Sequence, residues 1–314
     1  MTDEHRPVRE VHGKSGATHS ALYAPRSALA GCIRAYLSRS TREAAALTPE
    51  ERQNHFPPTS TCVIVWLIGG QDSRVPAQDN TQPDDGTSLP VVFSGPHTRP
   101  SISHNEGAVQ FFTLLIYPDA VRALTGLEVR PHINGYSPFA SLFDSDWQGM
   151  ARAVLTAPDD GMRVRLIEEF LGPRWAAVQS AAAKKPNDPA ATTNHSLAAV
   201  ARAHRLAAWS SDVALRATVQ GAGQSERQVD RRIKTWTGQT LRQLRSIGRL
   251  EKVLLAANPV ALGTVPAWST LAADSGFSDQ PHLCREFRRY TGFSPAELKR
   301  RLNHESFWVY RIWA

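Results

Sequence analysis

The chain has 314 residues, and its hydrophobic fraction of 41% is sufficient for two domains of ordinary size with packed cores. The formal net charge is +7, but residues 196–314 hold 18 Lys and Arg against 9 Asp and Glu, whereas the rest of the chain holds 18 against 20, so the last third is expected to meet a polyanion. No apolar run approaches the roughly 18 residues of a membrane-spanning helix, and three cysteines are too few for a disulfide framework or a Cys-based zinc site.

The N-terminal 20 residues are polar and show no periodicity, so we expect a disordered tail over 1–20. They contain no apolar segment of the kind that a secretory signal peptide needs. The cysteines Cys32, Cys62 and Cys284 are expected to be reduced thiols. Together these features predict a cytoplasmic protein that has no contact with a membrane.

The segment after this tail is predicted to be rich in β-strands. Three stretches indicate strands because they are rich in β-branched or aromatic residues between Gly, Pro or polar residues; they are Thr61–Ile68, Pro90–Phe93 and Ala108–Tyr117. Ser27–Leu37 fits either a short helix or a strand. Residues 38–59, 71–89, 94–100 and 103–107 are expected to be irregular connections or loops, with a charged helical turn around Thr48–Gln53.

Helices are expected to follow the strands. Pro118–Leu124 has proline in its first turn and Asp119 where a carboxylate complements the helix dipole. Ser141–Leu155 and Gly161–Leu171 are amphipathic, which fits either packing beside the strands or a dimer contact. This order favours a small β-barrel or sandwich with helices packed beside it. Lys184–Asn194 is polar and contains two prolines, which indicates a linker.

The most informative pattern lies near the C-terminus, over Ala272–Pro295. Leu283, Phe287 and Tyr290 are spaced i, i+4, i+7, so they share one face of a helix. Gly276 lacks a Cβ and lets the chain adopt positive φ between this helix and a shorter one before it. Donors and cations lie opposite the apolar face. The pattern indicates a helix-turn-helix whose second helix is suited to a major groove.

A looser copy of this pattern precedes it by 54 residues. Val229, Ile233 and Trp236 repeat the spacing of the buried face. Between the copies, Leu241–Ala256 predicts a continuous helix of roughly 24 Å. A rod of that length is able to hold two recognition helices about one duplex turn apart, roughly 34 Å from centre to centre.

These two units resemble the DNA-binding module of the AraC/XylS family of bacterial transcription regulators. The matching residues of the second unit are Leu271-Ala272, Gly276–Gln280, His282-Leu283, Arg285, Phe287–Arg289, Thr291-Gly292 and Ser294-Pro295. The first unit departs from the family where Thr218-Val219 replace a Leu-Ala pair. The N-terminal segment resembles the cupin-like sensor domain of the family through Phe56-Pro57, Val63–Ile68, Gly95-Pro96 and Tyr117–Leu127.

Together with the disordered tail over 1–20 and a linker over 184–195, the resemblance implies an α+β chain with a sensor and dimerisation domain over 21–183 and a DNA-binding domain over 196–314. The sensor would be a cupin-like β-barrel with helices, and the DNA-binding domain would be all-α, with two helix-turn-helix units joined by a long helix. The implied partners are double-stranded DNA, a small-molecule effector, a second copy of the chain and, for an activator, RNA polymerase.

Side chains opposite the apolar stripe of each recognition helix are the candidates for DNA contact. Arg matches guanine and Gln matches adenine in the major groove, each worth about 1–3 kcal/mol of discrimination. The candidates are Arg227, Gln228, Asp230, Arg231 and Arg232 in the first unit and Gln280, His282, Arg285, Arg288 and Arg289 in the second. Of these, Arg232, Arg288 and Arg289 fit phosphate contacts or solvated charges, and Asp230 fits base contact or orientation of a neighbouring Arg.

No enzymatic activity, cofactor or metal is expected. The sequence has eleven histidines but no His-x-His pair of the kind a metal-dependent cupin needs, and no phosphate-binding glycine loop. Trp66, Phe93, Phe111 and Phe112 fit either an effector pocket or the core, and the aromatic segment Phe307–Ala314 is expected to pack on the DNA-binding domain. Two alternatives remain, a cupin-type enzyme that carries a DNA-binding module and a regulator that has no ligand.

Overall fold

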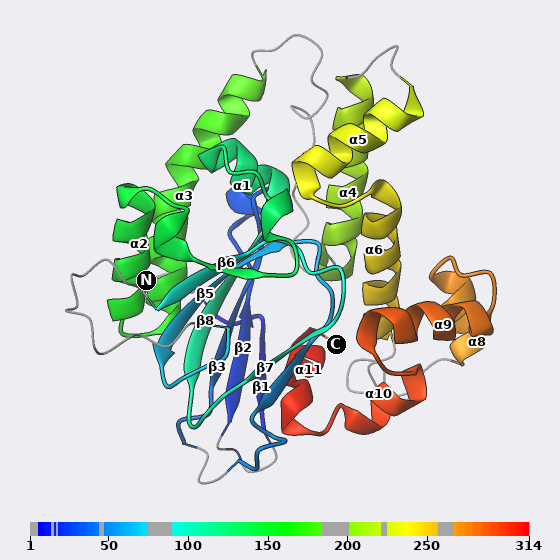
Figure 1. Cartoon of the computed structure of the whole chain (residues 1–314), viewed down its shortest axis with the longest axis horizontal. Helices are drawn as coiled ribbons and strands as arrows, with labels where there is room; N and C mark the ends of the chain where they lie inside the picture. The colour runs from blue at the N-terminus through cyan, green and yellow to red at the C-terminus, as the bar shows by residue number, and fades with distance from the viewer. Residues whose placement is uncertain are drawn as a thin grey trace.

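The computed structural model describes residues 6–13, 16, 18–43, 47–74, 90–183, 201–220, 225–256 and 267–313. Residues up to 183 form a β-rich N-terminal part with helices, and residues from 201 onward form a helical C-terminal part (Figure 1). The α+β class expected from the sequence is therefore confirmed. The linker expected over 184–195 lies outside the described residues, as does most of the loop expected over 71–89.

Two antiparallel sheets contain the strands of the described residues. The larger has the order β1-β2-β3-β8-β5-β6-β9, and the smaller pairs β4 with β7. The strands are β1 (Arg9–His12), β2 (His19–Tyr23), β3 (Ile33–Ser40), β4 (Gln53–Phe56), β5 (Cys62–Gly69), β6 (Val91–Ser94), β7 (Ser101–His104), β8 (Gln110–Ile116) and β9 (Tyr136–Pro138). The central strand β8 lies between β3 and β5, and its side chains are almost all buried.

The three strands predicted most directly are confirmed as β5, β6 and β8. Ser27–Leu37 resolves into a 3-10 turn over Ser27–Leu29 followed by β3. The prediction of disorder over 1–20 is wrong for β1, and the predicted irregular connections miss β4 and part of β7. These short strands carry few apolar residues, since at least one face of each is not fully buried. Their hydrogen bonds come from neighbouring strands and not from a local pattern.

Three helices of the N-terminal part follow the strands. They are α1 (Pro118–Thr125), α2 (Ser145–Thr156) and α3 (Asp160–Ala183). Helix α2 begins where Asp144 accepts hydrogen bonds from the backbone N–H groups of Asp146 and Trp147. Helix α3 is longer than predicted and continues through Pro173, although proline removes a helical hydrogen bond. Its first half is anchored in the core by the buried side chains of Val164, Ile167 and Leu171.

The C-terminal part contains the predicted pairs of helices. Its helices are α4 (Ala201–Val219), α5 (Glu226–Thr237), α6 (Leu241–Ala256), α8 (Trp268–Asp274), α9 (Gln280–Thr291), α10 (Pro295–Arg301) and α11 (Trp308–Trp313). The connecting helix α6 has the bounds that the sequence predicted. Leu244, Ile247, Leu250 and Val253 form its buried stripe, as the period of 3.6 residues requires.

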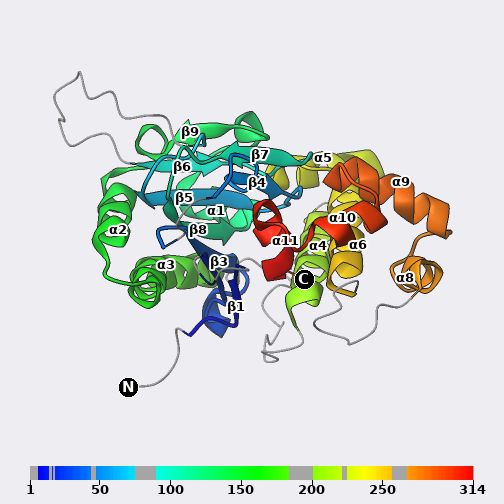
Figure 2. The ribbon, with the colours of Figure 1, turned by 90° about the horizontal axis from the view of Figure 1, so that it is seen from below.

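The aromatic C-terminal segment does not pack mainly where the sequence predicted. Helix α11 lies against β1, β2 and β4 of the N-terminal part, although it also touches α6 (Figure 2). The indole N–H of Trp308 donates to the side-chain oxygen of Asn54 over 2.8 Å, and Arg39 lies 5.0 Å from the Trp308 ring centroid. Phe307 stacks on His55 with 4.5 Å between ring centroids. Trp308, Val309 and Ile312 belong to a buried hydrophobic cluster whose other members come mainly from the strands of the larger sheet.

The two parts of the chain are held together by buried polar contacts as well as apolar ones. On α1, Asp119 accepts from Trp209 over 2.9 Å and forms an ion pair with Arg216, both on α4. On β3, Arg34 forms an ion pair of 2.6 Å with Glu251 on α6. Truncating one partner of such a buried pair leaves the other charge without compensation, so these contacts restrict how the C-terminal part sits on the sheet.

We expect Trp308→Ala to lower the free energy of unfolding by about 3–5 kcal/mol, because it empties the space of a side chain that is 1% exposed. Trp308→Phe keeps most of the packing and loses the bond to Asn54, which is worth about 1 kcal/mol. Leu215→Ala, at a position that is 51% exposed, should change stability by less than about 0.5 kcal/mol. Urea denaturation measures all three, and equal effects of Trp308→Ala and Leu215→Ala would contradict the packing of α11.

Candidate nucleic-acid interface and a neighbouring cavity

The first helix-turn-helix unit consists of α4 and α5. Helix α5 begins with a capping box in which the backbone N–H of Ser225 donates to the side chain of Gln228 over 2.8 Å. It ends at Gly238, whose φ of 73° places it in the left-handed region. Ile133 of the N-terminal part lies 2.8 Å from where a Cβ at position 238 would be, so a larger residue here would also clash. The capping box and Gly238, both encoded locally in the sequence, therefore set the two ends of α5.

The second unit consists of α8 and α9. Gly276 between them has a φ of 75°, as the helix–turn–helix pattern predicted. Asp279 caps α9 by accepting from the backbone N–H of His282 over 2.6 Å. The predicted stripe of Leu283, Phe287 and Tyr290 is buried. The outer face of α9 is thereby turned to solvent.

Most of the predicted DNA-binding side chains are exposed. The exposed ones are Arg227, Gln228, Arg231, Gln280, Arg285, Arg288 and Arg289, and the half-buried ones are Asp230, Arg232 and His282. The exposed side chains carry a strong positive charge, because five of the seven are arginines. Arg289 also pairs loosely with Glu286 over 3.4 Å, but its side chain is 65% exposed.

Besides Arg289, four of the predicted residues have partners within the chain. The Gln228 side chain belongs to the capping box of α5. Asp230 accepts from the backbone N–H of Leu241 over 3.3 Å, and Arg232 donates to the carbonyl of Ala217 over 2.7 Å. His282 lies 2.9 Å from the Ser278 hydroxyl. These contacts join α5 to α4 and α6 and shape the second turn, which the pattern of the sequence alone did not reveal.

The two recognition helices are held by α6. Helix α5 lies near one end of α6 and α9 near the other (Figure 1), and Figure 2 shows both on the same side of it. The 16 residues of α6 span about 24 Å. On α9, Glu286 accepts from Ser246 of α6 over 3.1 Å, and Arg249 of α6 donates to the carbonyl of Gly276 over 3.2 Å. The spacing of the two helices is therefore set by a rigid element and by direct bonds.

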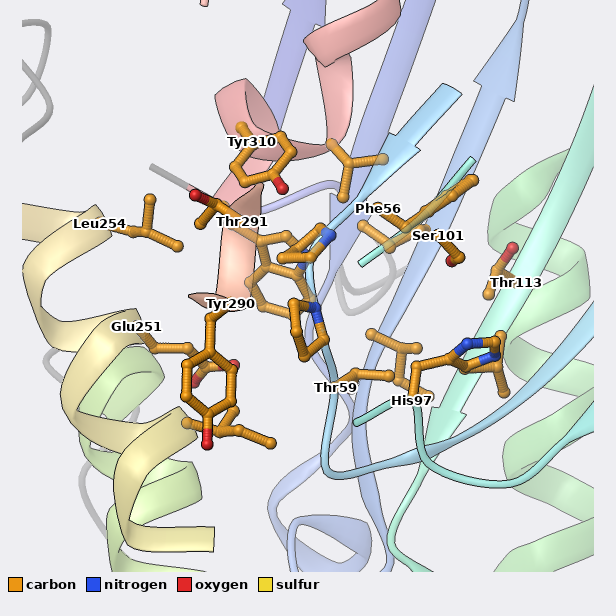
Figure 3. A pocket seen from close by; sticks show the side chains of 18 of the residues that line it. Phe56, Thr59, His97, Ser101, Thr113, Glu251, Leu254, Tyr290, Thr291 and Tyr310 are labelled. Carbon is orange, nitrogen blue, oxygen red and sulfur yellow. The ribbon is translucent and has the colours of Figure 1, made fainter. Parts of the chain in front are cut away.

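A cavity of about 100 Å³ lies between the sheets and the C-terminal part. One wall comes from β3, β5 and β8, another from α6 and α9, and a third from α11. Figure 3 shows Glu251 and Leu254 on the α6 side of this space and His97 and Thr113 on the opposite side. The walls are mainly apolar, and the residues of the Arg34–Glu251 ion pair are among those that line them.

The aromatic residues considered for a pocket divide between this cavity and the core. Phe111 lines the cavity, whereas Trp66, Phe93 and Phe112 are fully buried in the main core. Phe111 and Phe112 are neighbours on β8 and point to opposite faces of the sheet, as alternation along a strand requires. The remaining lining residues come from elements far apart in the sequence, so no local signal marked them.

His97 is a cavity residue whose ionisation is changed by its burial in the fold. Burial lowers the pKa of His97 to about 4, and the nearby cations Arg74 and Arg99 act in the same direction. The side-chain hydroxyl of Ser94 lies 2.8 Å from its Nε2 atom. His97 is therefore neutral at neutral pH and serves as a hydrogen-bonding group in the wall.

Comparison with known families identifies the helical module. A family model described as a helix-turn-helix domain matches residues 219–301, which extend from the last residue of α4 through α5, α6 and the second unit to the end of α10. The chain is thus a helix-turn-helix DNA-binding protein. The matched domain is of the AraC type, and the chain is a DNA-binding transcription regulator. No described helix is sufficiently long and apolar to cross a membrane.

Solved structures with some similarity include three of ToxT from Vibrio cholerae. The 1.65 Å structure is 11% identical and has a TM-score of 0.34, with 78% of this chain and 92% of that chain covered. ToxT bound to (E)-4-(8-methylnaphthalen-1-yl)but-3-enoic acid is 11% identical, with a TM-score of 0.35 and coverage of 78% and 93%. ToxT bound to an unsaturated fatty acid is 13% identical, with a TM-score of 0.33 and coverage of 78% and 90%. Such low scores assign no residue or ligand to this chain, and no curated protein matches it.

We expect the stability of the protein to fall between about pH 6.5 and pH 4 because of His97. The unfolded chain binds a proton at this side chain near pH 6.5, whereas the folded chain does so only near pH 4, so acid favours unfolding by up to about 3 kcal/mol. His97→Gln should reduce this loss. Free energies of unfolding at about pH 7 and pH 4.5 test the expectation, and equal losses in both proteins would contradict it.

Proposed function

We propose that this regulator binds DNA in a sequence-specific manner by placing α5 and α9 in successive major grooves, and that a small molecule controls it. The observation that carries the proposal is the position of two capped helices with exposed arginines on the same side of the rigid helix α6. Their outer faces stay exposed while the C-terminal part is docked on the sheets. DNA could therefore be engaged without complete separation of the two parts.

The exposed side chains divide into two expected roles. Arg227, Arg231, Gln280 and Arg285 lie in the first turns or middle of their helices and are proposed to contact base edges. Arg288 and Arg289, in the last turn of α9, are proposed to contact phosphates. The predicted residues with internal partners, Gln228, Asp230, Arg232 and His282, are proposed to contribute mainly by positioning the helices that they connect.

The domain organisation proposed from the structure modifies the one expected from the sequence. A sensor domain would extend over the described residues from 6 to 183, with β1 included, because β1 pairs with β2. The DNA-binding domain would begin at or near residue 196, and its last helix, α11, would serve as a wall of the sensor. We also propose that the protein forms a homodimer and is located in the cytoplasm with chromosomal DNA. If it is an activator, it would contact RNA polymerase.

The cavity is proposed as the effector site. Its walls come from both parts of the chain, so an occupant that fits one arrangement of the two parts better than another shifts the equilibrium between them. The mainly apolar walls and the nearby guanidinium of Arg34 favour an apolar molecule with an acidic group. Such a group would compete with Glu251 for Arg34 and weaken the contact between β3 and α6.

The base-contacting role of the arginines is tested with duplexes selected from a random library by the wild-type protein. Arg231→Ala and Arg285→Ala should each reduce the preference for a selected over a scrambled duplex by about 1–3 kcal/mol, or about 5- to 150-fold. Arg289→Ala should weaken binding to both duplexes alike. Arg165→Ala, which removes an exposed arginine on α3, serves as the matched control. Unchanged preference in both base-contact variants would reject the assignment.

The effector site is tested by filling the cavity. Leu254→Trp places a larger side chain in its α6 wall, and Leu215→Trp makes the same change at an exposed position on α4. Hydrophobic carboxylic acids that raise the thermal midpoint of the wild type should also raise that of Leu215→Trp but not that of Leu254→Trp. Binding of a selected duplex checks that both variants are folded. If the acid still raised the thermal midpoint of Leu254→Trp, its binding site would lie outside this cavity.

A further inference from the structure

A cluster of potential metal ligands lies far from the recognition helices, at the edge of the larger sheet. The nitrogen and oxygen ligand atoms of Glu10, His12 and His19 all lie within 4.8 Å of one another. Glu10 and His12 are on the edge strand β1, and His19 is on β2. Neither the DNA-binding helices nor the cavity uses these side chains. Among the described residues, no other group of three His, Cys, Asp or Glu side chains shares this property.

The register of the two strands brings the three side chains to one face. His12 and His19 are direct partners, and Glu10 lies two residues before His12, on the same side of β1. Gly13 donates its backbone N–H to the carbonyl of Thr18, so those two residues form a hydrogen-bonded pair. The adjacent pair, His12 and His19, is therefore of the non-hydrogen-bonded type, in which side chains lie closest together.

The distances between the ligand atoms are close to those of a coordinated ion. In a tetrahedral zinc site with bonds of about 2.0–2.1 Å, ligand atoms are about 3.3 Å apart. His19 Nε2 and Glu10 Oε1 are already 3.2 Å apart, and the rings of His12 and His19 have centroids separated by 5.0 Å. Glu10 and His12 are exposed and His19 is half-buried, so an ion in solvent can reach the three side chains.

We propose that Glu10, His12 and His19 bind one divalent transition-metal ion of the zinc class, with water in the remaining position. Two imidazoles and one carboxylate are a ligand set that zinc accepts, and three protein ligands leave a fourth position open. The ion would join β1 to β2 near Thr18, whose hydroxyl donates to Glu305 over 2.8 Å at the base of the C-terminal segment. Its expected effect is therefore to stabilise the edge of the sheet on which α11 packs.

Calorimetric titration of the untagged full-length chain with zinc chloride tests the proposal, at about pH 7.5, where imidazoles are largely neutral. We expect one ion per chain. Mutation of a residue that is hydrogen-bonded to a metal ligand weakens metal affinity about 10–100-fold. Removal of a ligand itself should have at least this effect, so we expect His12→Gln and His19→Gln each to weaken zinc binding by about tenfold or more. His104→Gln, which removes an exposed histidine from β7, is the matched control and should bind as the wild type does.

Thermal unfolding with and without zinc provides a second readout and a check of folding. The metal-free variants should unfold at the wild-type midpoint, since the three side chains lie on the outer face of the hairpin. Zinc should raise the midpoint of the wild type and of His104→Gln, and should not raise that of a His12→Gln, His19→Gln double variant. Absence of zinc binding to the wild type, or equal binding by the double variant, would overturn the proposal.

Discussion

The arrangement of this regulator depends on one hydrophobic core that crosses from the β-sheet into both helix-turn-helix units. The buried cluster runs from Trp66 and Phe112 in the sheet through Leu206 and Val213 on α4 to Ile233 on α5, Leu250 on α6 and Leu283 on α9. Its apolar contacts carry most of the stabilisation, since the buried ion pairs roughly balance their own desolvation. The ion pairs of Arg34 and Asp119 instead restrict the docking to one arrangement. A continuous core means that the orientation of α5 and α9 is coupled to the packing of the sheet.

The parts of the fold that the sequence predicted are those in which one element buries its own periodic face. Helices α6 and α9 have apolar stripes with a period of 3.6 residues, and β5 and β8 are nearly continuous apolar strands. Each of these elements could therefore be predicted from the apolar pattern of its own residues. Strand β1 has a single apolar residue, Val11, and exists because β2 offers it hydrogen bonds. Helix α11 was assigned to the wrong neighbour, because a short aromatic segment specifies that it will be buried but not against which surface.

The same distinction applies to the candidate sites. The outward positions of Arg231 and Arg285 follow from helical periodicity, so their exposure could be predicted. The bonds of Asp230 to Leu241 and of Arg232 to Ala217 cross between helices and depend on how those helices pack. The cavity lies at the junction of three walls from separate segments, and the His12–His19 pair depends on strand register. Neither has a local signature, and only the folded chain brings their residues together.

Two walls of the cavity, α6 and α11, connect it physically to the second recognition helix. Helix α6 forms one wall through Leu250 and Leu254, and Ser246 on the same helix is bonded to Glu286 of α9. Helix α11 forms another wall, and Arg311 on it is bonded to the carbonyls of Leu302 and His304, just after α10. A change in cavity occupancy that moves either wall therefore acts on the second unit directly. The first unit is tied instead to α1 through Asp119 and Arg216. The two recognition helices are thus connected to different elements of the chain, so a movement of either cavity wall would change their relative orientation.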